Sequence, residues 1–132
     1  IDGALARCDG EGALVVMADC PLVRPEVLDV LCEAARPVAL CPAQDGGTNA
    51  LALRPADALQ PAFGIPDGAR ALVERAERLG LSAAVVEDDL LALDIDRAED
   101  VERLLELGAA TRTGRFLDRV LAASAQSSGG PR

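Results

Sequence analysis

Residues 13–22 read ALVVMADCPL, an apolar run that ends in a carboxylate and a proline. The run predicts a short strand over 13–18, and Pro21, which has no N–H to donate, stops the strand near Asp19. In open α/β sheets, ligands bind beyond the carboxyl ends of the strands, so Asp19 is a candidate for metal or phosphate chemistry. The alternative is that Asp19 only forms a local turn.

Strands and helices alternate along the rest of the chain. Alternation of this kind is typical of an α/β fold, with a mostly parallel sheet flanked by helices. We expect residues 1–122 to belong to one domain and residues 123–132, which are small and polar, to form a disordered tail. The predicted strands are 38–41, 48–53, 82–87 and 90–95, and the predicted helices are 25–35, 55–60, 67–79, 97–107 and 113–122.

The composition of the 132 residues argues against several functions. Half of the residues are apolar, but only Phe63 and Phe116 are aromatic, so Ala, Leu and Val must form the core. The 22 acidic and 13 basic residues give a net charge of −9. An acidic chain without Trp or Tyr lacks both the charge and the stacking surfaces of a nucleic-acid binder. No apolar stretch is long enough to span a membrane, and residues 1–20 do not show the basic-then-apolar pattern of a signal peptide.

The chain has four cysteines, Cys8, Cys20, Cys32 and Cys41, and no histidine. Because the cysteines form no C-x-x-C pair and no histidine is present, the sequence excludes a zinc site. The lack of histidine also excludes a histidine-dependent triad. We expect reduced, mostly buried thiols in a cytoplasmic protein rather than a disulfide framework.

A glycine-rich turn, DGGTN, occupies residues 45–49. Gly46 and Gly47 can adopt positive φ, so successive N–H groups can converge into a nest for an anion, with the Thr48 hydroxyl as a further donor. The alternative is an ordinary tight hairpin turn.

Residues 93–100 read LDIDRAED and concentrate carboxylates. Alternation in a strand places Asp94 and Asp96 on one face. Two like charges there are costly unless a cation compensates them, and Mg²⁺ held by one or two carboxylates and substrate phosphates would do so. The alternative for Asp96 is that it caps the following helix.

The segment 63–68, FGIPDG, precedes a predicted helix N-terminus, where free N–H groups favour an anion. Asp67, as N-cap, would compete for those donors. Arg70, one turn into the helix, is either a phosphate or carboxylate ligand or a solvated surface residue.

Four of these motifs, in this order, resemble the later half of the 2-phospho-L-lactate guanylyltransferases. That family belongs to the nucleotidyltransferase superfamily, which includes the molybdenum-cofactor guanylyltransferases. The resemblance covers residues 13–107, and TRTGR at 111–115 also resembles the ending of bacterial members. The motifs are MADCPL at 17–22, DGGTNAL at 45–51, FG at 63–64 and LDIDRAED at 93–100.

The resemblance implies a Rossmann-like fold and a step in coenzyme F-420 biosynthesis. In that step the phosphate of 2-phospholactate, phosphoenolpyruvate or 3-phosphoglycerate attacks the α-phosphorus of GTP and releases pyrophosphate. The resemblance also implies that the catalytic residues Asp19 and Asp96 hold Mg²⁺, with Asp94 beside them. The implied substrate-binding residues are Gly46, Gly47, Thr48, Asn49, Gly64 and Gly68.

The sequence departs from the family in two places. Gly68 stands where relatives have a serine that contacts the acceptor, with one extra residue between Gly64 and Asp67. The family's first strand and its glycine-rich, basic nucleotide loop are not in the sequence. Because the chain starts at Ile1 and its first residues read as the end of a helix, we expect a fragment or processed product whose N-terminal nucleotide-binding portion precedes Ile1.

Two other functions stay open from the sequence. One is a different cofactor or sugar nucleotidyltransferase, and the other is an inactive fragment that acts only as a binding domain. For the guanylyltransferase, the expected partners are GTP and a small phosphorylated acid, without nucleic acid or membrane. A homodimer is left open as the oligomeric state.

Overall fold

The computed structural model describes residues 2–5, 7, 8, 10–61 and 63–127. The chain divides into two compact units, Ile1–Asp94 and Ile95–Arg132. The first unit opens with the short helix α1, Asp2–Leu5, and contains the sheet with the helices α2, Pro25–Ala34, and α3, Gly68–Arg78.

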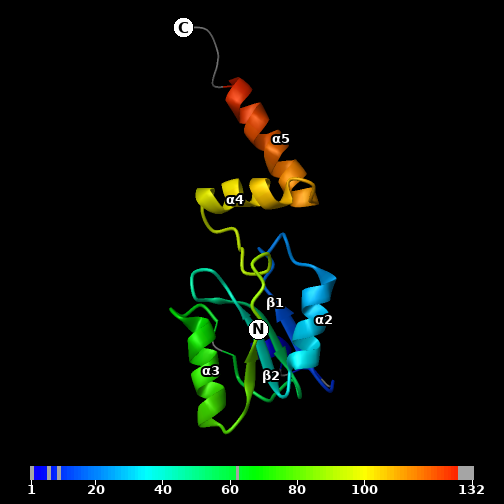
Figure 1. The fold of residues 1–132 in the computed structure, drawn as a ribbon, viewed down its shortest axis with the longest axis vertical. Helices are drawn as coiled ribbons and strands as arrows, with labels where there is room; N and C mark the ends of the chain where they lie inside the picture. Colours follow the sequence, from blue (N-terminus) through cyan, green and yellow to red (C-terminus); the bar gives the residue numbers. More distant parts are fainter. Residues whose placement is uncertain (1, 6, 9, 62, 128–132) are drawn as a thin grey trace. The chain divides into compact units, whose positions relative to one another are not determined.

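In the described residues, the sheet has the strand order β1-β3-β2-β4. The strands are β1, Ala13–Val16; β2, Val38–Pro42; β3, Thr48–Leu53; and β4, Ala83–Val85. β3 runs antiparallel to both β1 and β2, whereas β2 and β4 are parallel (Figure 1). The carboxyl ends of β1 and β2 therefore lie beside the start of β3.

The α/β class is as predicted, and the mostly parallel sheet is matched only in part, because the described sheet is mixed, with β2 and β4 parallel and the other two pairings antiparallel. β2 and β3 are joined by residues 43–47 only, which form a hairpin connection. A parallel connection requires a crossover of about a dozen residues or more, so a five-residue link forces antiparallel pairing.

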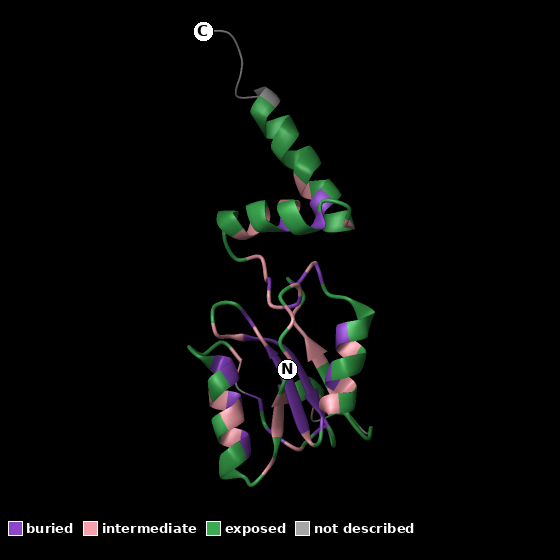
Figure 2. Ribbon diagram, in the orientation of Figure 1, coloured by how far each residue is buried: buried purple, intermediate pink, exposed green. Residues whose placement is uncertain are grey.

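The two central strands are buried on both faces, and each face has its own packing partner (Figure 2). One face carries small side chains and packs against the larger residues Val27 and Leu31 of α2. The other carries Val and Leu and packs against α3, which contributes the small residues Ala69 and Ala76 together with Leu72. Small residues thus face large ones, which fills the volume without aromatic side chains. On the α2 face lie Ala39, Cys41, Ala50 and Ala52, and on the α3 face Val38, Leu40, Leu51 and Leu53.

The predicted short helix over 55–60 is not formed. That segment consists of turns and bends, with one backbone hydrogen bond from Ala58 N–H to the Pro55 carbonyl. Ala56 and Leu59 are buried and anchor it to the core. A segment this short does not sustain helix by itself, so tertiary anchoring decides its conformation.

The predicted fifth strand over 90–95 is also wrong. Leu91 and Leu93 are buried, as the alternation predicts, but residues 89–92 form a turn. The Asp88 carboxylate accepts the N–H groups of Leu90 and Leu91, so those donors cannot join a sheet. β4 is correspondingly shorter than the predicted strand over 82–87.

The second unit pairs two helices, α4, Ala98–Gly108, and α5, Arg112–Ser127. They approach closely at their connection, where a Cβ on Gly114 would collide with the carbonyl oxygen of Gly108. Residues 123–127 are helical, so the disordered tail predicted over 123–132 is wrong for that part, and residues 128–132 lie outside the described residues. Among the helices that the structure describes, none has the length and apolar character needed to span a bilayer.

Candidate active site

Asp19 lies in an exposed turn just after β1. β1 ends at Val16, earlier than predicted, but the N–H of Met17 still donates to the Asn49 carbonyl at 2.9 Å. The end of the β1 segment is therefore fixed to the start of β3. The position of Asp19 beyond a strand end agrees with the sequence analysis, and its role as a metal ligand remains a prediction.

The first residues of β3 bring two buried polar side chains to this end of the sheet, Thr48 and Asn49. The Asn49 amide donates to the Leu91 carbonyl oxygen at 3.0 Å, and its Nδ2 also lies 3.4 Å from Asp94 Oδ1. The Thr48 hydroxyl is buried and finds no hydrogen-bond partner among the described residues. Buried polar atoms are usually satisfied, so this hydroxyl is suited to receive a ligand.

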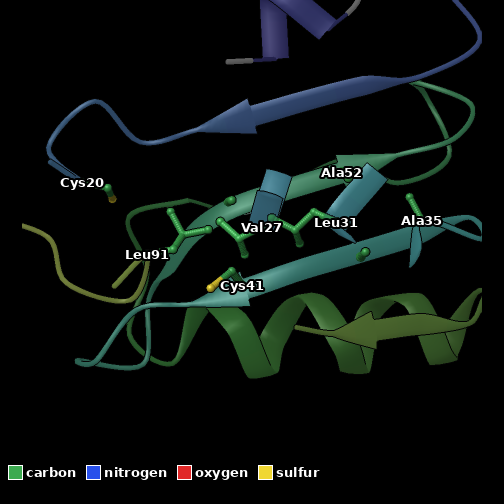
Figure 3. Close-up of a cluster of buried hydrophobic side chains, with 9 residues drawn as sticks. Cys20, Val27, Leu31, Ala35, Cys41, Ala52 and Leu91 are labelled. Atoms are coloured by element: carbon green, nitrogen blue, oxygen red, sulfur yellow. The ribbon is translucent and has the colours of Figure 1, made fainter. Parts of the chain in front are cut away.

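The cysteine that follows Asp19 is buried at this end of the sheet. Cys20 is buried, and Figure 3 shows it at the same end of the sheet as Leu91, whereas Ala35 lies at the other end. Burial raises the pKa of the Cys20 thiol to about 12, with further contributions from the charges of Asp19 and Asp94. The hydrogen bonds place the two carboxylates at the same end of the sheet: Met17, two residues before Asp19, donates to the Asn49 carbonyl, and Asn49 Nδ2 lies 3.4 Å from Asp94 Oδ1.

The four cysteines are free thiols, as the sequence analysis predicted. Cys20 and Cys41 are buried, Cys32 is half-buried, and Cys8 is exposed. Burial also raises the pKa of Cys41.

The glycine-rich turn adopts the hairpin alternative. Gly46 has a φ of 89°, and its N–H donates to the Ala43 carbonyl at 3.1 Å. The N–H of Gly47 donates to Asp45 Oδ1 at 2.8 Å. Because both amides already have acceptors within the turn, the predicted anion nest is not formed by these two groups. Contact of Gly46 and Gly47 with a substrate remains a prediction.

The start of α3 packs directly onto this turn. The N–H of Ala69 donates to the Gly46 carbonyl at 3.1 Å, and an added Cβ on Gly46 would lie 3.3 Å from Asp67 Oδ1. Asp67 stands at the predicted N-cap position with a φ of 51°, but its side chain makes no capping hydrogen bond. Gly68 is buried as the first residue of the helix, so it lies next to the glycine-rich turn.

Two further residues near the start of α3, Arg70 and Gly64, are exposed. Arg70 is exposed and forms ion pairs with Asp67 at 3.3 Å and Glu74 at 3.4 Å, which corresponds to the solvated alternative. Gly64 is exposed, has a φ of 74° and has open space around the position of a Cβ. Its contact with substrate remains a prediction.

The carboxylates of residues 93–100 do not share a strand face, since that segment is not a strand. Asp94 is half-buried at the end of the first unit, and Asp96 is exposed in the second unit. The helix cap is also shifted, because Arg97 occupies the N-cap position of α4. The N–H groups of Asp96 and Arg97 both donate to the carboxylate of Asp100. Asp96 as a metal ligand remains a prediction.

A family model described as "Guanylyl transferase CofC like" matches residues 1–132. The chain belongs to this family. The phosphoenolpyruvate guanylyltransferase of Sphaerobacter thermophilus is 42% identical over 106 residues, which are 78% of this chain and 50% of that protein. The 2-phospho-L-lactate guanylyltransferase of Methanothermobacter thermautotrophicus is 34% identical over 109 residues, which are 81% of this chain and 48% of that protein. The chain spans about half the length of the curated relatives it matches.

A solved structure from Desulfovibrio desulfuricans shares the fold of this guanylyltransferase family member. It is named after the nucleotide-diphospho-sugar transferases, and it superposes with a TM-score of 0.75 over 95% of this chain and 59% of that one. The identity is 19%, so the likeness shows the fold alone.

Magnesium binding by this CofC-like chain remains a prediction. Among the residues described here, no three or more His, Cys, Asp or Glu side chains cluster tightly enough to hold a metal by themselves. Mg²⁺ does not require such a cluster, because one or two carboxylates usually hold it together with waters and substrate phosphates. Asp19, which is exposed, and Asp94, which is half-buried, are the carboxylates of the first unit that could take this part.

The sequence analysis missed one feature of this site, the turn that begins at Asp88. Its carboxylate receives the N–H groups of Leu90 and Leu91 and an ion pair from Arg24. Burial raises the pKa of Asp88, but the hydrogen bonds from Leu91 and Arg24 outweigh burial and hold the pKa below its usual range. An aspartate that accepts N–H groups two and three residues ahead is a recognised turn signal, and it could have been read at residues 88–91.

Proposed function

We propose that the protein containing this chain transfers GMP from GTP to a phosphorylated three-carbon acid and releases pyrophosphate, as a step in coenzyme F-420 biosynthesis. The family match over residues 1–132 and relatives named phosphoenolpyruvate and 2-phospho-L-lactate guanylyltransferase support this proposal. The observation that carries it is the contact of the buried Asn49 with Asp94, at the end of the sheet where Met17 is hydrogen-bonded to Asn49 and Asp19 follows.

The residue types suit nucleotidyl transfer. The phosphate of the acceptor is itself the nucleophile, so the absence of histidine from the chain is no obstacle. Such reactions depend on positioning and on stabilising charge rather than on a covalent enzyme nucleophile. A bound Mg²⁺ would offset the charge on the α-phosphate and pyrophosphate, and we propose that Asp19 and Asp94 of the first unit supply carboxylates to hold it. Asp96, which belongs to the second unit, stays a prediction as a metal ligand.

The acceptor is proposed to bind where β3 begins. The Thr48 hydroxyl, which is buried and finds no hydrogen-bond partner among the described residues, is the group best suited to hold the acceptor's carboxylate or phosphate. Asn49, Gly64 and the contact between Gly46 and the start of α3 surround this position in the proposal. We also propose that the protein is cytoplasmic, because its four cysteines are free thiols and thiols stay reduced in the cytoplasm.

The direct test incubates the full-length protein with GTP, Mg²⁺ and each of the three acids in turn. We expect release of pyrophosphate with one acid, and ATP, CTP and UTP serve as matched nucleotide controls. Absence of turnover with all three acids would overturn the proposed activity. Turnover with a different nucleotide and acceptor would instead favour another nucleotidyltransferase.

A further inference from the structure

An ion pair joins two segments that are far apart in the sequence. Arg24 Nη2 lies 2.6 Å from Asp88 Oδ2, across 64 positions. Asp88 is largely buried, with 14% of its side chain exposed, whereas the Arg24 side chain is 52% exposed. A short pair with one buried partner differs from the exposed pairs of α3 and α4, which contribute little to stability.

Arg24 terminates the segment that begins at Asp19. It occupies the N-cap position of α2 with extended backbone angles, and Pro25 follows as the first helical residue. Between the two ends, the side chains of Cys20 and Leu22 are buried, and the N–H of Val23 donates to the Cys20 carbonyl. Residues 19–24 therefore form a short segment held by its own contacts. Because the segment is short, fixing Arg24 at one end restricts the turn that carries Asp19 at the other.

Asp88 starts the segment that ends at Asp94. Its Oδ1 accepts the N–H groups of Leu90 at 3.1 Å and Leu91 at 2.9 Å, and its carbonyl accepts Ala92 N–H at 2.8 Å. One carboxylate thus uses one oxygen to form the turn and the other to bind Arg24. The two oxygens couple the shape of the turn to the position of the Arg24 segment.

The turn then holds the polar residues of the candidate site. The Leu91 carbonyl receives the Asn49 amide, and the Ala92 carbonyl receives the N–H of Gln44 at 3.1 Å. Asn49 in turn contacts Asp94 at 3.4 Å. A displacement of Leu91 would therefore be transmitted to Asn49 and to the carboxylate of Asp94.

We propose that Arg24 and Asp88 form a positioning pair that fixes the segment carrying Asp19 against the segment carrying Asp94. The pair sets the separation of the two carboxylates and so determines how well they share a divalent cation. This inference rests on the proposed function, and neither residue is proposed to touch substrate or metal.

The test measures Mn²⁺ binding to the full-length protein by electron paramagnetic resonance, with and without GTP. The variants are Arg24→Gln, Asp88→Asn and the double variant. Asn at 88 keeps an oxygen to accept the N–H groups of the turn, so the variant isolates the loss of the ion pair. Arg103→Gln, which removes the exposed Arg103–Glu106 pair of α4, is the matched control.

We expect each single variant to raise the Mn²⁺ dissociation constant about tenfold, which corresponds to about 1.4 kcal/mol. The double variant is expected to raise the constant no further, because residues that act as one unit are not additive. Arg103→Gln is expected to leave the constant unchanged, and Arg24→Lys is expected to recover part of the loss.

Two results would overturn the inference. One is an unchanged dissociation constant in both single variants, whether or not their thermal stability falls. The other is a double variant whose loss equals the sum of the two single losses. If Asp88→Asn does not fold, Arg24→Gln alone decides, since its side chain is half exposed. If the wild type transfers no GMP but the single variants bind Mn²⁺ more weakly, only the proposed function is contradicted. If the wild type is active and the Mn²⁺ dissociation constants of the variants are unchanged, only this inference is contradicted.

Discussion

Asn49 Nδ2 and Asp94 Oδ1 lie 3.4 Å apart, although 45 positions separate the two residues in the sequence. Asn49 belongs to an antiparallel strand, and Asp94 follows a turn after the last strand of the sheet. Their contact brings a buried amide and a carboxylate to the end of the sheet where β1 stops and Asp19 follows.

The buried amide of Asn49 is expected to contribute to the stability of the fold. We expect Asn49→Ala to lower the free energy of unfolding by about 1–3 kcal/mol, because the Leu91 carbonyl loses its donor inside the protein. Urea denaturation of the full-length protein measures this change. Gln60→Ala, at an exposed position, is the control. Equal stability of the two variants would show that the amide contributes nothing.

The exposed carboxylate of Asp19 makes the second prediction. We expect Asp19→Asn to abolish guanylyl transfer while circular dichroism and the melting temperature stay close to the wild type, because the side chain lies in an exposed turn. Asp57→Asn, which changes an exposed carboxylate in the 54–60 segment, should retain full activity. Wild-type turnover in Asp19→Asn would reduce Asp19 to a turn residue.

The glycine at position 46 makes the third prediction. Gly46 and Gly80 have φ values of 89° and 70°, so an alanine at either position meets left-handed strain of about 1–2 kcal/mol. Gly46→Ala also places its Cβ 3.3 Å from Asp67 Oδ1, whereas Gly80 has open space. We therefore expect Gly46→Ala to be the more destabilising in urea denaturation. A greater loss from Gly80→Ala would contradict the packing of the turn against α3.

The carboxylate of Asp88 makes the fourth prediction, on pH. Its pKa is lower in the folded protein than the usual value, so it stabilises the fold above the usual aspartate pKa. That contribution is lost as the pH falls through the folded value. We expect Asp88→Asn to cost about 1–2 kcal/mol at pH 7 and progressively less in acid. Unfolding free energies measured across this range check the sign, and a cost that grows in acid would contradict it.

The cysteines make the fifth prediction. Only thiolates react with iodoacetamide, and burial raises the pKa of Cys20 to about 12. We expect mass spectrometry of the native protein to find Cys8, which is exposed, modified while Cys20 and Cys41 are not. All four should react once the chain is unfolded in urea. Native modification of Cys20 as fast as Cys8 would show that the Asp19 turn opens readily.

The sequence by itself determined most of the local elements and the class of the fold. The apolar run before Asp19 gives β1, Pro25 begins α2 and Gly80 follows the end of α3, because these signals act over a few residues. The five-residue link at 43–47 already required a hairpin, so the mixed sheet was available from the sequence as well. Motif order was sufficient to identify the family before any contact was known.

Only the tertiary structure decided which polar groups meet. Residues 90–95 alternate like a strand, yet the Asp88 carboxylate takes the N–H groups that a sheet would need, and Arg24 reaches this carboxylate from another segment. The amides of Gly46 and Gly47 were expected to be available to an anion, but Ala43 and Asp45 receive them. Each side chain could make its bond with several partners, and the choice follows from the packing of α2, α3 and the sheet, which brings distant segments within hydrogen-bond range.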